Sequence, residues 1–215
     1  MGRWSVVERS LRAEGARLIA GVDEVGRGPL AGPVFACAVI MPPGARAIAG
    51  VEDSKKLSAA ERERLATKIR ARAVCVSLGA ASVREIAALN IYQATSLAMR
   101  RALRRLAQRP DAVLVDGKPI KTLGVAHRAV VGGDSRIYSI ACASIVAKVA
   151  RDRLMRALAR RHPAYGWEAN AGYGTPAHIQ ALRERGMTLH HREKFCEGLL
   201  REGGGVRGLG DGGGA

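Results

Sequence analysis

The chain has 215 residues, of which 47% are hydrophobic and 25% charged, a composition typical of a globular protein that can bury a core. Its 35 lysines and arginines exceed its 19 acidic residues by 16, and a positive charge of this size favours a polyanionic partner, most commonly nucleic acid. The longest apolar stretch, 34–41, is too short to span a bilayer, and residues 1–20 are too highly charged for a secretory signal, so we expect no membrane association.

Five short apolar runs that contain β-branched residues predict strands. They cover residues 17–24, 34–41, 73–80, 112–115 and 126–131. Three of them precede the first long helical stretch, and helices alternate with strands after it. This order predicts an α/β protein in which helices flank a mixed five-stranded sheet with a meander at one edge.

One helix is predicted between the third and fourth strands, with Asn90 as its N-cap. Its apolar face comprises Leu97, Ala102, Leu103 and Leu106. Four arginines lie largely on the opposite face: Arg100, Arg101, Arg104 and Arg105. This arrangement favours a solvated face over a binding surface.

A second, longer helix is predicted over residues 137–161, apolar at its start and basic at its end, as suits the helix dipole. We expect Ser139 and Ser144 to let this helix approach the sheet closely, and Asp152 to form salt bridges.

The chain is expected to form one domain over residues 17–202 after a lead-in of residues 1–16. Its core extends to about residue 161, and residues 162–202, rich in glycine, histidine and aromatic residues, form a small helical appendage. Residues 203–215 are mostly glycine and are expected to be a disordered tail.

Cysteines and histidines show no zinc-binding spacing. The cysteines are scattered at Cys37, Cys75, Cys142 and Cys196, a pattern that fits reduced thiols in a cytoplasmic protein. The histidines of the appendage are His162, His178, His190 and His191, and we assign them structural or phosphate-contacting roles.

Acidic residues end three of the predicted strands. Asp23 and Glu24 end the first and lead into a glycine-rich turn, while Asp116 and Asp134 follow the fourth and fifth. Each acid alone is compatible with ordinary turn chemistry. Together they predict hard oxygen ligands for magnesium or manganese, and two such ions can activate water and stabilise the leaving oxygen in phosphodiester cleavage.

These motifs resemble those of bacterial ribonuclease HII. The resemblance is carried by DEVGRGPLAGPV at 23–34, DSKKLS at 53–58, VDG at 115–117, SIACASIVAKVARD at 139–152 and GYGT at 172–175. It extends in family order from about Ile19 to Phe195. Ribonuclease HIII is disfavoured because only 22 residues precede Asp23, fewer than its N-terminal domain requires.

The resemblance implies a ribonuclease H-like fold. It also implies an endonuclease that hydrolyses the RNA strand of RNA–DNA hybrids and incises 5′ of single ribonucleotides in duplex DNA, leaving 3′-hydroxyl and 5′-phosphate ends. It implies roles in ribonucleotide and primer removal, a monomer, and two Mn²⁺ or Mg²⁺ ions. The family's metal-binding acids map onto Asp23, Glu24, Asp116 and Asp134, the same set that the strand ends indicate.

The resemblance also assigns substrate contacts. The backbone of Gly26, Arg27 and Gly28 contacts the ribose 2′-hydroxyl, the group that distinguishes RNA from DNA. Tyr173 stacks on the sugar at the RNA–DNA junction. The pair Lys55 and Lys56 contacts phosphates, although without the resemblance it would be interpreted as surface charge.

Four positions depart from the family pattern: Gly132, Lys118, Cys142 and Lys194. They leave fine substrate contacts open. Two alternatives remain, a basic nucleic-acid-binding protein without catalysis, and another nuclease of the same fold such as a junction resolvase. The four acids argue against the first alternative, and the Gly-Arg-Gly turn with Tyr173 argues against the second.

Overall fold

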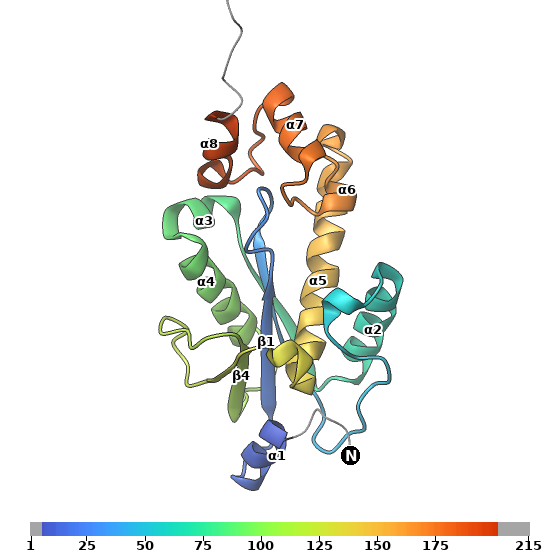
Figure 1. Cartoon of the computed structure of the whole chain (residues 1–215). Helices are drawn as coiled ribbons and strands as arrows, with labels where there is room; N and C mark the ends of the chain where they lie inside the picture. The colour runs from blue at the N-terminus through green and yellow to red at the C-terminus, as the bar shows by residue number, and fades with distance from the viewer. Residues whose placement is uncertain (1–5, 202–215) are drawn as a thin grey trace, which may run out of the picture.

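The computed structural model describes residues 6–201, so the predicted tail at 203–215 and the first part of the lead-in lie outside the described residues (Figure 1). A five-stranded mixed sheet forms the centre, in the order β3-β2-β1-β4-β5. Its strands are β1 (Ile19–Val25), β2 (Val34–Ile40), β3 (Cys75–Ala81), β4 (Ala112–Asp116) and β5 (Arg128–Val130). The predicted fold class is confirmed, with each strand within a few residues of its expected position.

The central strand β1 joins two kinds of pairing. It is antiparallel to β2, which is in turn antiparallel to β3, and it is parallel to β4. In the parallel register Val22 pairs with Val115, so the next residue on each strand is an acid, Asp23 and Asp116. Sequence positions almost a hundred residues apart are therefore brought to the same edge of the sheet.

The expectation that three strands precede the first long helix is wrong. The 14-residue helix α2 (Ala59–Arg72) lies between β2 and β3 and begins at a capping box formed by Ser58 and Glu61.

Helices cover both faces of the sheet (Figure 1). On one face lie α5 (Tyr138–Ala159) and α2 (Ala59–Arg72), whose apolar residues pack with Cys37 and Val39 of β2. On the other lie α3 (Val83–Leu89) and α4 (Ile91–Arg104), which pack with Ala36 and Ala38. This alternation along β2 is what a strand buried on both faces requires. Within the predicted lead-in, α1 (Val6–Ala13) packs through Val7 and Leu11 against a smaller cluster.

The contact between α5 and β1 depends on small residues. A Cβ placed on Gly21 would lie 2.2 Å from the carbonyl carbon of Ser139, so only glycine permits this approach. Ser139 lies at this contact and is 2% exposed, whereas Ser144 lies further along α5 and its hydroxyl is hydrogen-bonded to that of Ser54 at 3.0 Å. Asp152 pairs with Lys148 at 2.7 Å and with Arg62 at 3.8 Å, as predicted.

The predicted cap of α4 is confirmed, and the interpretation of its arginines is corrected. The Asn90 side chain accepts a hydrogen bond from the amide of Gln93. Arg101, expected to be solvated, instead donates to both carboxylate oxygens of Glu85 and to the carbonyl of Ala80 at 2.7 Å. Sheet and helix lie close enough here for an arginine to join them.

The appendage is built of short elements at one end of the sheet, uppermost in Figure 1. They are the turn η3 (Pro163–Tyr165) and the helices α6 (Trp167–Asn170), α7 (Pro176–Arg185) and α8 (Glu193–Arg201). The turn between β1 and β2 meets them through backbone hydrogen bonds, from Leu30 N to Gly172 O at 2.8 Å and from Arg192 N to Leu30 O at 2.7 Å. The appendage is therefore attached directly to the glycine-rich turn.

Two further findings concern the whole described chain. All four cysteines are free thiols. Over residues 6–201, no helix combines the length and the apolar character needed to cross a bilayer.

Candidate active site

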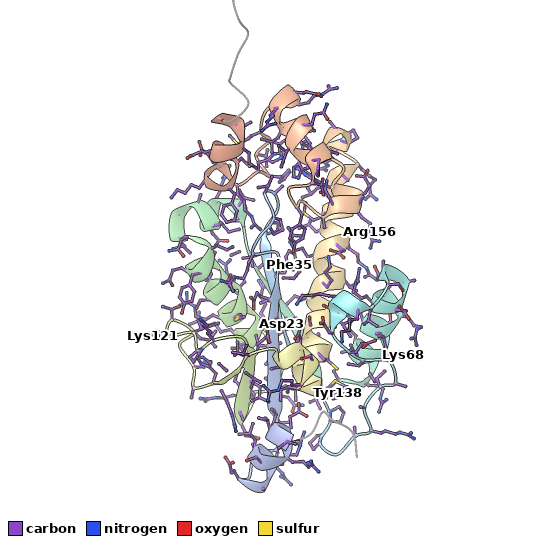
Figure 2. The ribbon with its side chains drawn as sticks, in the orientation of Figure 1. Asp23, Phe35, Lys68, Lys121, Tyr138 and Arg156 are labelled. Atoms are coloured by element: carbon purple, nitrogen blue, oxygen red, sulfur yellow. The ribbon has the colours of Figure 1, made fainter. Side chains whose placement is uncertain are left out.

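The four acids predicted from strand ends lie together. Asp23 and Glu24 come from β1, Asp116 from the end of β4, and Asp134 from the turn η2 (Gly133–Ser135) that follows β5. All four line a cleft of about 180 Å³. The same cleft is also lined by Val25, Ser54, Lys55, Ser144, Lys148 and Tyr173. Asp23 lies near the middle of the molecule, between the two helical layers (Figure 2).

Asp23 is the most deeply placed acid, with 5% of its surface exposed. Burial raises its pKa well above the ordinary value, and the charges of Glu24 and Asp116 raise it further. One carboxylate oxygen accepts a hydrogen bond from the amide of Glu24 at 2.7 Å. An ionised carboxylate is costly in such a place unless a cation accompanies it.

Asp116 connects the end of β4 to the turn η2, which carries Asp134. Its Oδ1 atom accepts a hydrogen bond from the amide of Gly133 at 2.6 Å. This bond fixes η2 against β4 and so brings Asp134, the next residue, to the cleft. Burial also raises the pKa of Asp116.

The two outer acids each have a cationic partner. Arg27 donates to Glu24 at 3.3 Å, and Lys55 Nζ lies 3.5 Å from Asp134 Oδ2. Among residues 6–201, no three acidic, histidine or cysteine side chains already converge as the ligands of one ion would.

Some of the residues predicted to contact substrate line the acidic cleft, and others do not. Tyr173 is 44% exposed and lines the acidic cleft, and a Cβ on Gly28 would lie 3.8 Å from its ring, so the Gly-Arg-Gly turn borders it. Lys55 also lines the cleft, whereas Lys56 is exposed and does not. Gly26 has a φ of +90°, a left-handed conformation that favours glycine.

A second cleft, of about 400 Å³, adjoins the first because both are lined by Glu24 and Asp116. Arg27, Tyr92 and Lys118 contribute to it, so the departure at Lys118 places a cation beside the acids. Much of the remaining positive charge lies on the outer surface, where Lys68, Lys121 and Arg156 extend away from the sheet (Figure 2). Together the two clefts place acidic side chains at the centre and basic side chains around them. The basic side chains can attract a polyanion, and the acidic ones can bind cations that accompany it.

Sequence reasoning missed two buried arginines. Arg151 is fully buried and Arg192 is 2% exposed, and both donate to backbone carbonyls of the glycine-rich turn. No distinct signal in the sequence marks Arg151, because it lies in the basic half of α5 beside Asp152 and Arg153. Two histidines of the appendage serve structural roles, since His178 and His191 are buried and hydrogen-bonded to each other at 3.1 Å, whereas His162 and His190 are half-buried.

Comparison with known proteins places this arrangement in context. The family model for ribonuclease HII matches residues 20–198. The chain is similar to ribonuclease HII of Granulibacter bethesdensis, with 54% identity over 94% of this chain and 93% of the relative, and of Paracoccus denitrificans, with 56% identity over 90% and 91%.

Solved structures agree. Ribonuclease H2 of Pyrococcus horikoshii superposes with a TM-score of 0.75 and 25% identity, covering 86% of this chain and 98% of that one. The structure of a PCNA:RNase HII complex from Archaeoglobus fulgidus gives a TM-score of 0.68 and 26% identity, covering 81% and 93%.

Proposed function

This chain belongs to the ribonuclease HII family and is an endonuclease of the type 2 ribonuclease H class, and we propose that it hydrolyses the RNA strand of RNA–DNA hybrids and incises 5′ of single ribonucleotides in duplex DNA. The products would carry 3′-hydroxyl and 5′-phosphate ends. Such an activity would serve ribonucleotide removal in DNA repair and primer removal in replication.

One observation carries the proposal: four carboxylates from three separate segments line one cleft that borders the Gly-Arg-Gly turn and Tyr173. A binding protein without catalysis would gain nothing from buried negative charge beside a polyanion. A nuclease without preference for ribose would have no need of a turn and an aromatic ring beside its acids. Both alternatives are therefore less well supported.

The donor set fits divalent metal ions. Asp23, Glu24, Asp116 and Asp134 offer only hard oxygen atoms, and the raised pKa values of Asp23 and Asp116 indicate negative charge that lacks compensation. We propose that these four hold two Mg²⁺ or Mn²⁺ ions, a choice supported by a ribonuclease HIII of the same fold solved with Mn²⁺. The ions would lower the pKa of a water molecule and offset charge on the leaving oxygen.

The chain's own residues would bind and orient the substrate. Lys55, Lys148 and Arg27 place positive charge around the acids, where it can attract the phosphates on either side of the scissile bond. Tyr173 offers an exposed ring to the sugar at the RNA–DNA junction, and the backbone of Gly26, Arg27 and Gly28 offers hydrogen-bonding groups to its 2′-hydroxyl. Lys56 would contact phosphate outside the cleft.

We further propose that the protein acts as a monomer in the cytoplasm. Support for a monomer comes from the cleft, to which one chain contributes all four acids. Support for the location comes from the four free cysteines, a use of cysteine typical of reducing compartments.

The test is cleavage of three matched duplexes: an RNA–DNA hybrid, a DNA duplex with one ribonucleotide, and the same duplex in all-DNA form. With magnesium or manganese the first two should be cut, the second on the 5′ side of the ribonucleotide, and chelation should abolish both reactions. Comparable cleavage of the all-DNA duplex would contradict the proposal, and binding without cleavage under every metal condition would favour the non-catalytic alternative.

A further inference from the structure

Arg192 is buried beneath the glycine-rich turn and donates only to backbone carbonyls among the described residues. Its Nη1 atom donates to the carbonyl of Arg27 at 2.8 Å, and Nη2 donates to those of Gly26 at 2.5 Å and Gly32 at 2.7 Å. The Nε atom donates to Gly32 as well, at 2.9 Å. One guanidinium group therefore holds both ends of the turn, and the ring of Phe195 lies 5.3 Å from it.

No carboxylate accompanies this charge: Arg192 forms none of the ion pairs found over residues 6–201. Burial lowers its pKa to about 9, and the nearby charge of Arg151 acts in the same direction. An apolar side chain would fill the same space without this desolvation cost. What an apolar side chain could not do is orient three carbonyl groups.

The orientation of the carbonyls fixes the orientation of the amides. In a trans peptide the C=O of one residue and the N–H of the next point in opposite directions, and the described chain has no cis peptide. Because the carbonyls of Gly26 and Arg27 point toward Arg192, the amides of Arg27 and Gly28 point away from it. Within the described part of the chain, neither amide donates a hydrogen bond to the protein.

Arg151 supports the turn from α5. It donates to the carbonyls of Pro33 at 3.0 Å, Ala31 at 2.9 Å and Ala171 at 2.8 Å, so it joins the turn to the segment that carries Tyr173. A Cβ on Gly26 would lie 2.2 Å from its Nε atom. The turn is thus held by two guanidinium groups, and only glycine fits beside the second.

We propose that Arg192 is a positioning residue for ribose recognition: by binding the carbonyls of Gly26 and Arg27, it holds the amides of Arg27 and Gly28 outward, ready to donate to the 2′-hydroxyl of the substrate. This inference rests on the proposed function, because it assigns a cause to the ribose preference of the same site. It requires that the two amides, rather than the charge of Arg192, make the contact.

The test compares binding of two duplexes in the presence of chelator, one with a single ribonucleotide and one all-DNA, by fluorescence polarisation. Arg192→Met keeps an apolar chain of similar length but donates no hydrogen bond. Two misdirected amides should reduce the preference for the ribonucleotide duplex about tenfold, given the usual worth of a hydrogen bond, while affinity for the all-DNA duplex changes less than about twofold. Arg192→Lys, which retains the charge but not the fork, should lose part of the preference.

Arg101→Met is the matched control. Arg101 also donates a hydrogen bond to a backbone carbonyl, that of Ala80, but it contacts no part of the turn. It should lower the melting temperature and leave the preference unchanged. If folded Arg192→Met retains the wild-type preference, or if both affinities fall together, the inference is wrong. Should Arg192→Met fail to fold, Arg192→Lys decides, and an unchanged preference overturns the inference. If wild type itself has no preference and cuts neither ribose-containing substrate, the proposed function fails instead.

Discussion

Lys55 Nζ lies 3.5 Å from Asp134 Oδ2, so a lysine on the turn η1 (Ser54–Lys56) neutralises an acid held by η2. The Lys55 side chain is 81% exposed and that of Asp134 only 11%. An ion pair with so solvated a partner contributes little to stability, and it breaks readily. If Asp134 binds a metal ion as proposed, release of the lysine should not disturb the fold.

Asp134→Asn should reduce cleavage of the single-ribonucleotide duplex by at least roughly 100-fold, because one oxygen ligand and one negative charge are lost at the reacting centre. Duplex affinity in chelator should stay within a few-fold, since the phosphate-contacting cations remain. Single-turnover cleavage and polarisation measure the two effects. Asp111→Asn is the control, because Asp111 only accepts from the amides of Arg17 and Leu18 at the far end of β4. Near-normal turnover of Asp134→Asn at saturating magnesium would remove Asp134 from the ligand set.

Tyr173 is predicted to act through its ring more than through its hydroxyl. Tyr173→Phe keeps the stacking surface and should weaken discrimination between ribose and deoxyribose only modestly. Tyr173→Ala loses a stacking contact worth on the order of 1–3 kcal/mol, and its single-turnover rate should fall by roughly 10-fold or more. An alanine variant that cleaves as fast as wild type would reduce Tyr173 to a packing residue.

The segment that carries Tyr173 is anchored by two neutral histidines. His178 Nδ1 lies 2.8 Å from the carbonyl of Tyr173, which can only accept, so Nδ1 carries a proton. His191 Nδ1 accepts from the amide of Thr188 at 2.9 Å, so its proton is on Nε2. His178 Nε2 then accepts from His191 Nε2 and from Trp167 Nε1, each at 3.1 Å. A proton added to either ring would place two donors face to face.

Acid should therefore destabilise the protein through His191. Burial is the main cause that lowers the pKa of His191 to about 4, and repulsion between the two rings when His178 is protonated acts in the same direction. Between its ordinary value near 6.5 and about 4, the unfolded chain binds a proton that the folded chain does not, so stability falls as the pH falls. The loss attributable to this group approaches about 3 kcal/mol and is complete near pH 4. Urea unfolding from pH 7 to 4 measures it.

His191→Gln should flatten that dependence, because glutamine can accept from Thr188 and donate to His178 without titrating. His127→Gln, outside the network, should leave the dependence as in wild type. Equal slopes for wild type and His191→Gln would show that other groups govern stability in acid.

Gly21→Ala should destabilise the protein by about 1–3 kcal/mol or more, because its Cβ would overlap the backbone at Ser139 and force α5 away from β1. Thermal unfolding measures the change. Gly198→Ala is the control, since a Cβ there meets nothing within 4 Å on an exposed helix and should stabilise slightly. Equal melting temperatures for wild type and Gly21→Ala would mean that helix and sheet can separate without cost.

The elements found correctly from sequence were those with a local signal. Short apolar runs with β-branched residues marked the strands, and Asn90 marked the start of α4. The acids were found because each follows or ends a strand, and the carboxyl ends of the parallel strands β1, β4 and β5 meet at one edge of the sheet. Missed features depend on contacts between distant segments. The pairing of Arg101 with Glu85 requires α3 and α4 to be in place, and nothing near Arg192 in the sequence indicates that it binds Gly26.

The attachment of Arg192 to the turn at Gly26 has a consequence for synthesis. The four acids are all present once residue 134 has been made, whereas the residue that orients the turn emerges almost sixty positions later. A chain that is released early or clipped within the appendage would retain its metal ligands but lack its means of telling ribose from deoxyribose. Fidelity, on this reasoning, is the last property that the growing polypeptide acquires and the first that proteolysis from its C-terminal end would remove.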